Sequence, residues 1–100
     1  MDIKSIYKEK IITVDEALDK VKSNFEIVCS LGPCEPQLFL SNLHKIKDSV
    51  ENVSIVTMLS LGKYKFNSDE SMKNSFINEC TFYSGINRKN HHYGIMSYIP

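Results

Sequence analysis

The sequence predicts an open α/β fold with a mainly parallel sheet and βαβ crossovers. Short apolar runs rich in β-branched residues alternate with segments whose apolar side chains recur at helical spacing. Each of the first three runs is followed by a turn that contains a glycine. This alternation is typical of βαβ units, and 100 residues suffice for one domain with a thin core.

Two helices are predicted before the first strand. Residues 2–9 carry apolar side chains at helical spacing and predict a short first helix. Thr13 and Glu16 form a capping box, so we expect a second helix over residues 14–22. Asn24 follows it and can adopt the left-handed conformation that ends a helix.

The first strand and the third helix meet at a turn that contains glycine and proline. Residues 25–30 are short, apolar and β-branched, as in a buried strand. Gly32 and Pro33 end that strand, and Pro36 fits the first position of the next helix. The buried stripe of this helix is predicted to consist of Phe39, Leu40, Leu43 and Ile46.

The second half repeats the pattern. We expect strands at residues 53–59, 80–84 and 95–99, and a turn with one helical turn at residues 85–90. Between the first two of these strands, Met72, Phe76 and Ile77 predict a short helix begun by Ser68 or Asp69.

Charge and cysteine content limit the partners. Twelve basic residues balance twelve acidic ones, which argues against binding of nucleic acid or an anionic membrane. No apolar stretch approaches the roughly 20 residues that span a bilayer. The three cysteines include no C-x-x-C pair, which predicts a reduced, cytoplasmic protein, and Cys29 and Cys80 fit small core positions within strands.

Candidate binding residues lie in the turns after the strands, at residues 31–35, 60–63 and 84–88. In an open parallel sheet, ligands bind beyond the carboxyl ends of the strands. Gly32, Gly62 and Gly85 occupy these turns, either because a ligand approaches the backbone or because such turns require glycine in any case. None of the turns has a nucleotide-binding fingerprint.

Two charged residues in these turns have alternative roles. Glu35 precedes a helix N-terminus, where the dipole favours an ionised carboxylate and disfavours a general acid. It either orients a substrate hydroxyl or amide, or it is a solvated carboxylate that pairs with the dipole. Arg88 is the only arginine, and it either clamps a carboxylate or lies on the surface.

The remaining chemical groups predict no catalytic residue and no metal site. His91 and His92 are adjacent, so their rings diverge, and we expect a solvated pair in a loop. Cys34 at a helix N-terminus could act as a nucleophile, but the nearest potential base, His44, lies within the following helix.

Seven segments carry a resemblance to a known family. They are residues 2–7, 13–17, 22–23, 34–36, 52–53, 58–63 and 97–100. Through them the chain resembles the acetyl-CoA hydrolase/transferase family, in the branch of 4-hydroxybutyrate and butyryl-CoA:acetate CoA-transferases. The resemblance covers the whole chain but only the N-terminal portion of the family's protein, so residues 1–100 are expected to form a single, incomplete N-terminal domain.

The resemblance implies an activity. The complete enzyme exchanges CoA between an acyl-CoA thioester and a short carboxylate such as acetate, butyrate or 4-hydroxybutyrate, through a glutamyl-CoA intermediate. CoA is then a substrate and no cofactor is bound covalently. The nucleophilic glutamate belongs to the second half of the family's protein, so this chain alone is expected to be inactive. The chain would associate with further copies of itself, as a homo-oligomer, or with a C-terminal half.

The resemblance also selects site residues. Glu35-Pro36, Gly62-Lys63 and Arg88 match family positions on the substrate side. With the other two turn glycines, the expected substrate-binding residues are Gly32, Glu35, Pro36, Gly62, Lys63, Gly85 and Arg88. The alternative is a non-catalytic remnant, or an interaction module that pairs with a separately encoded half. The chain departs from the family at Tyr93 and Tyr98, where a proline and a glutamate are common.

Overall fold

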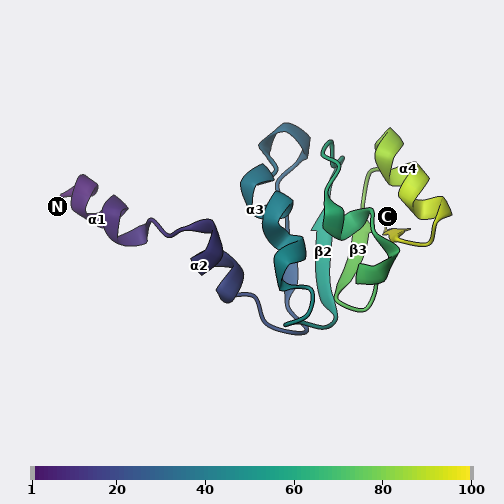
Figure 1. Ribbon diagram of the computed structural model, residues 1–100. Helices are drawn as coiled ribbons and strands as arrows, with labels where there is room; N and C mark the ends of the chain where they lie inside the picture. Colours follow the sequence, from purple (N-terminus) through teal and green to yellow (C-terminus); the bar gives the residue numbers. More distant parts are fainter. Residues whose placement is uncertain (1, 100) are drawn as a thin grey trace.

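The computed structural model describes residues 2–99 and contains one four-stranded sheet (Figure 1). All neighbouring strands are parallel, in the order β1-β2-β3-β4. The strands are β1 (Glu26–Val28), β2 (Val53–Thr57), β3 (Phe76–Cys80) and β4 (Met96–Tyr98). The helices are α1 (Ile3–Lys10), α2 (Val14–Asp19), α3 (Gln37–Asn42) and α4 (Gly85–His92). The predicted α/β fold with a parallel sheet is therefore confirmed.

Four short 3₁₀ helices complete the connections, at Gly32–Cys34, Leu43–Ile46, Lys65–Asn67 and Glu70–Met72. Figure 1 shows α3 in front of the sheet, with helical turns beside it. Leu40 and Leu43, both from the predicted apolar stripe, are fully buried there. Pro36 caps α3 at its N-terminus, so the helix begins one residue later than predicted.

The strands bury alternate residues, as the period of two requires. The buried side chains of the two central strands are Val53, Ile55, Thr57, Phe76, Asn78 and Cys80. The other four residues of these strands are partly or fully exposed: Ser54, Val56, Ile77 and Glu79. The core thus lies between one face of the sheet and α3 with the 3₁₀ helices, and no element within residues 2–99 covers the opposite face.

The N-terminal helices lie to one side of the sheet. Figure 1 shows α1 projecting from the body, and none of its residues is buried. The predicted capping box of Thr13 and Glu16 starts α2, which ends at Asp19, three residues earlier than expected. Asn24 has φ 68°, the predicted left-handed conformation. No helix within residues 2–99 is long and apolar enough to cross a lipid bilayer.

The third strand lies earlier in the sequence than predicted. Asp69 does cap a short helix, but Glu70–Met72 is only one 3₁₀ turn, and Phe76 opens β3. The predicted helix through Phe76 and the predicted strand at residues 80–84 are wrong. Phe76 pairs with Val53 across the sheet, and this partner from a distant segment outweighs the local helical spacing. Residues 85–92 form α4 instead of a single helical turn.

Candidate functional site

The turns after β1, β2 and β3 are joined to one another at the carboxyl edge of the sheet. The Gly32 amide donates a hydrogen bond to the Met58 carbonyl at 3.0 Å, and the Leu59 amide donates to the Phe82 carbonyl at 3.0 Å. Gly32 and Leu59 have φ values of 36° and 51°, in the left-handed region that a leucine rarely adopts. The three turns thus form a continuous rim, as expected for a parallel sheet.

Glu35 is the centre of this rim. Its side chain is only 5% exposed, and its carboxylate accepts four hydrogen bonds. The donors are Ser60 Oγ at 2.9 Å, the Leu61 amide at 3.2 Å, the Gly62 amide at 3.0 Å and Tyr64 Oη at 2.9 Å. The expectation of a solvated carboxylate is therefore wrong. Through these hydrogen bonds, Glu35 joins the turn after β1 to the turn after β2.

Gly62 is required by the packing of the same turn. A Cβ atom at this position would overlap the phenol ring of Tyr64. Tyr64 is buried, and its burial raises the pKa of its hydroxyl, with a further rise from the Glu35 carboxylate. The phenol therefore remains protonated at neutral pH and keeps donating to Glu35.

Cys29 lies beside this cluster at the end of β1. Its thiol is buried, which confirms the predicted core position. Burial raises the pKa of Cys29 to about 11, and the Glu35 carboxylate adds to the rise. The thiol is thus neutral at physiological pH and unsuited to nucleophilic attack.

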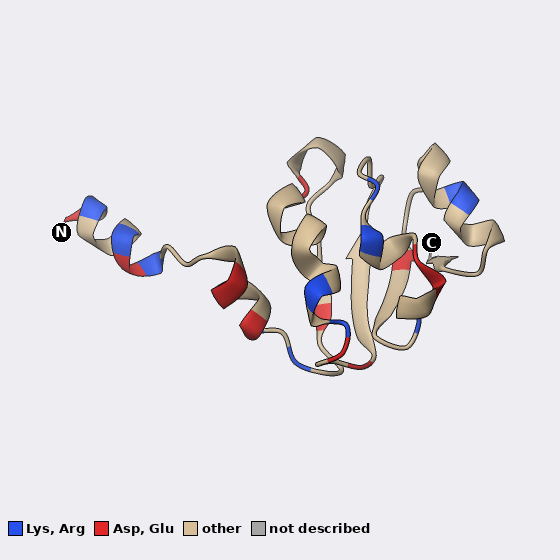
Figure 2. Ribbon diagram, viewed as in Figure 1, with Lys and Arg blue, Asp and Glu red and all other residues tan. Residues whose placement is uncertain are grey.

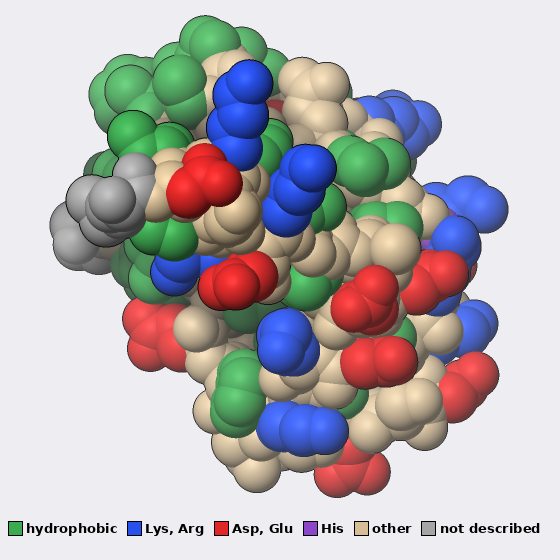
Figure 3. Space-filling view, turned by 90° about the vertical axis from the view of Figure 1, so that its left-hand side faces the viewer, with side chains coloured by type: hydrophobic (Ala, Val, Ile, Leu, Met, Phe, Trp, Pro, Cys, Tyr) green, Lys and Arg blue, Asp and Glu red, His purple; other side chains and the backbone are tan. Residues whose placement is uncertain are grey.

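An apolar hollow opens on the rim. It has a volume of about 350 Å³ and is lined by Leu31, Met58, Leu59, Thr81 and Phe82. Phe82 is 64% exposed although it is a large hydrophobic residue. In Figure 3, hydrophobic side chains gather at the top of the molecule, the end toward which β2 and β3 point in Figure 1. This hollow can receive a short apolar group.

The structure brings three of the seven predicted site residues together. Gly32, Glu35 and Gly62 form the connected part of the rim, because Glu35 joins Gly62 directly and a Cβ on Gly32 would lie 3.3 Å from the Leu59 carbonyl. Of the other four, Pro36 and Lys63 adjoin this cluster in sequence but line other cavities, and Gly85 and Arg88 lie in α4.

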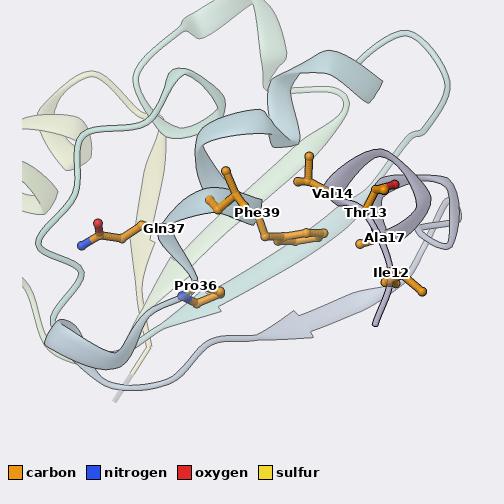
Figure 4. A pocket seen from close by; sticks show the side chains of 8 residues that line it. Ile12, Thr13, Val14, Ala17, Pro36, Gln37 and Phe39 are labelled. Atoms are coloured by element: carbon orange, nitrogen blue, oxygen red, sulfur yellow. The ribbon is translucent and has the colours of Figure 1, made fainter. Parts of the chain in front are cut away.

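Pro36 faces the N-terminal helices. It lines a cavity of about 360 Å³ between the start of α3 and α2. Figure 4 shows the Phe39 ring in this cavity beside Val14 and Ala17, with Ile12 at its edge. This cavity is away from the rim, so Pro36 shapes the end of the turn rather than the hollow.

The remaining three residues lie on or near α4. Lys63 faces α4 across a third cavity, with Lys89 among the other lining residues. Gly85 opens α4, and a Cβ there would meet nothing within 4 Å. Arg88 is exposed on α4 and lines none of these three cavities. No feature of the fold requires glycine at position 85.

The side chains considered for thiol or metal chemistry are dispersed. Cys34 is exposed in the Gly32–Cys34 turn. His91 and His92 lie in α4, not in a loop as predicted, and His91 Nδ1 is 2.8 Å from Tyr83 Oη. Within residues 2–99, no group of three or more His, Cys, Asp or Glu side chains is placed to hold a metal ion.

Two residues that contact Glu35 could not be identified from the sequence. Ser60 and Tyr64 bind Glu35 across 25 and 29 residues, and no local spacing reveals such a contact. The hollow does leave a signal, since Leu31 and Phe82 are large apolar residues placed just after strands, where turns are usually polar.

Comparisons with known proteins bear on the family resemblance and on the fold. The chain is 30% identical over 100 residues to the 4-hydroxybutyrate coenzyme A transferase of Clostridium kluyveri, across all of its own length and 23% of that protein. This match confirms the predicted resemblance to the CoA-transferases. No protein-family model matches the chain.

Solved structures support the fold. The crystal structure of RipA from Yersinia pestis matches all of this chain and 26% of its own chain, with a TM-score of 0.83 and 18% identity. A point mutant of RipA matches with a TM-score of 0.84, again at 18% identity. This chain therefore spans about a quarter of the length of the transferase and of RipA.

Proposed function

We propose that the rim and its apolar hollow form part of the substrate-binding site of a CoA-transferase. Such an enzyme exchanges CoA between an acyl-CoA thioester and a short carboxylate. The observation that carries the proposal is the apolar hollow on the rim, whose first two turns are joined by the hydrogen bonds of Glu35. The chain is also similar over its whole length to a 4-hydroxybutyrate coenzyme A transferase. The hollow holds the acyl chain, and the rim fixes its shape.

Rigidity supports this role. Substrate-binding groups act best when their own geometry is fixed before the substrate arrives. The four hydrogen bonds of Glu35 and the packing of Gly62 against Tyr64 fix the second turn relative to the first. The Met58 and Leu59 side chains that line the hollow come from the start of that turn.

Glu35 is a positioning residue in this proposal, not the nucleophile. Its carboxylate is buried and already accepts from four donors, so attack on a thioester would require breaking the rim. Cys29 is neutral and buried. The covalent step is therefore left to the family's glutamate in the second half, and the isolated chain should show no turnover.

The proposal extends to the acceptor carboxylates, the partner of this chain in the complete enzyme and the cellular compartment. Acetate, butyrate and 4-hydroxybutyrate are the acceptors that we propose, since an apolar hollow favours short carboxylates with few polar groups. The working assembly pairs this chain with a C-terminal half or a second subunit. Three free cysteines are consistent with a reduced, cytoplasmic setting.

A chimera tests the proposal. The matching segment of the Clostridium kluyveri transferase is replaced by this chain, and exchange between butyryl-CoA and acetate is measured. The chimera should exchange CoA, and the isolated chain should not. Phe82→Asp in the chimera should raise the KM for butyryl-CoA about tenfold or more, because it places a charge in an apolar site.

Ile3→Asp is the matched control. Ile3 is 74% exposed on α1, so the same chemical change there should leave KM unaltered. A chimera that is folded by circular dichroism but inactive would contradict the proposal. Equal effects of the two substitutions would place the acyl chain elsewhere.

A further inference from the structure

The third cavity differs in chemistry from the apolar hollow. It lies between α4 and the chain that follows β2, and has a volume of about 350 Å³. Its lining residues are Lys63, Ser68, Ile86, Lys89, Asn90 and Tyr93. Two of these side chains are cationic and none is acidic. We propose that this cavity binds the phosphate group of a ligand, either inorganic phosphate or a phosphate monoester.

The charge of the lining favours a dianion. Lys63 lines the cavity from the loop after β2 and Lys89 lines it from α4, and both residues are exposed. Figure 2 shows basic residues on α4 and on the loop beyond β2, and no acidic residue on α4. Two ammonium groups stabilise a dianion more than a monoanion, since each Coulomb term scales with the ligand charge. A phosphate monoester is largely dianionic at neutral pH.

The buried amide of Asn90 also favours a ligand in this cavity. Its side chain is only 6% exposed, and its Nδ2 is buried without a hydrogen-bond partner. A buried donor without a partner has lost its hydrogen bonds to water, and a ligand oxygen that accepts from it restores that loss. Because Asn90 lines the cavity, an anion oxygen that reaches this amide would accept a hydrogen bond from it.

The other polar groups hold the walls in place. Ser68 Oγ donates to the Tyr64 carbonyl at 2.6 Å, so its hydrogen is already used. Lys73 Nζ donates to the Tyr93 carbonyl at 3.3 Å, which fixes the end of α4. The anion is therefore held by Lys63, Lys89 and Asn90.

This site does not depend on the proposed function. It shares no lining residue with the apolar hollow. The chain as a whole is neutral, so the two lysines must attract the ligand locally, and binding should weaken as salt is added.

Amide chemical shifts of the ¹⁵N-labelled 100-residue chain test the inference. Inorganic phosphate, adenosine 3′,5′-bisphosphate and acetate are titrated at equal ionic strength. Saturable shifts are expected at residues 63, 68 and 86–93, with phosphate bound more tightly than acetate. Lys63→Gln and Lys89→Gln should each weaken phosphate binding about tenfold, the scale of one charge-assisted hydrogen bond.

Lys8→Gln on α1 is the matched control and should change nothing. Tighter binding of the nucleotide than of phosphate would identify the ligand as a nucleotide phosphate. Equal binding would identify a free oxyanion, and both results uphold the site. The inference is overturned if phosphate causes no saturable shift, if acetate binds as tightly as phosphate, or if Lys8→Gln weakens binding as much as Lys89→Gln.

Discussion

Tyr64 Oη donates a hydrogen bond of 2.9 Å to the Glu35 carboxylate, 29 residues earlier in the chain. The bond crosses from the turn after β1 to the segment after β2. With three further donors on the same carboxylate, it makes Glu35 the common acceptor of the second turn.

Removal of this acceptor should destabilise the fold. Glu35→Ala leaves four donors without their partner, and we expect a loss of about 3 kcal/mol in the free energy of unfolding. Urea unfolding followed by circular dichroism measures it. Glu35→Gln keeps one oxygen and should lose less. Glu9→Ala, on exposed α1, is the control and should stay within about 0.5 kcal/mol of the parent chain. A Glu35→Ala chain as stable as Glu9→Ala would show that the rim does not depend on this carboxylate.

Two glycines should respond in opposite ways to the same substitution. Gly62→Ala drives a Cβ into the Tyr64 ring and should cost about 2 kcal/mol. Gly85→Ala meets open space at the start of α4 and should be neutral or stabilise by up to about 1 kcal/mol. Thermal unfolding of both variants checks the pair. The destabilisation caused by Gly62→Ala should be smaller in a Tyr64→Leu background, because the ring is no longer there. If it is as large as before, the backbone at position 62 and not the Tyr64 ring is its cause.

Alkaline pH should weaken the fold through Cys29. The folded pKa of about 11 exceeds the ordinary value of 9.0, so the folded state holds the thiol proton more tightly than the unfolded state. This stability is fully present below pH 9 and is lost as pH rises through about 11, by about 2–3 kcal/mol in total. The raised pKa of Tyr64 adds to the loss at the upper end.

Urea unfolding at a series of pH values from 7 to 11 measures this slope. Cys29→Ala should flatten it, whereas Cys34→Ser should leave it unchanged because Cys34 is exposed. If the Cys34→Ser chain lost the slope and Cys29→Ala kept it, the buried thiol would not be the cause.

Deletion of α1 should leave the body intact. No residue of α1 is buried, and an isolated helix of eight residues has little stability of its own. A chain that begins at Ile11 should therefore have the same free energy of unfolding, measured in urea, within about 0.5 kcal/mol. A larger loss would reveal contacts between α1 and a second copy, and the loss would then depend on protein concentration.

Local signals in the sequence predicted most of the fold. Val53 and its neighbours form an apolar run flanked by polar residues, and Gly32 and Gly62 mark the turns, so β1, β2 and the rim lie where expected. The third strand was misplaced because Met72, Phe76 and Ile77 also fit a helical stripe. Their true arrangement depends on pairing with β2, which lies more than 20 residues away.

The site was predictable in position but not in chemistry. Residue type and the neighbouring Pro36 indicated a charged Glu35 at a helix start. Its burial depends on Ser60, Gly62 and Tyr64, which reach it only after the sheet has formed. Lys63 follows Gly62 directly in sequence, yet it lines the cavity beside α4, and no local spacing indicates this.

The open face of the sheet affects how mutations in this chain should be interpreted. All-parallel sheets are normally covered on both sides, yet Ser54, Val56, Ile77 and Glu79 have no layer over them within residues 2–99. In the 100-residue chain these four positions should tolerate substitution as surface positions do. In any assembly that covers the face, the same substitutions would be as costly as core changes. Mutational tolerance measured on the chain alone would therefore underestimate the constraint on half of its sheet.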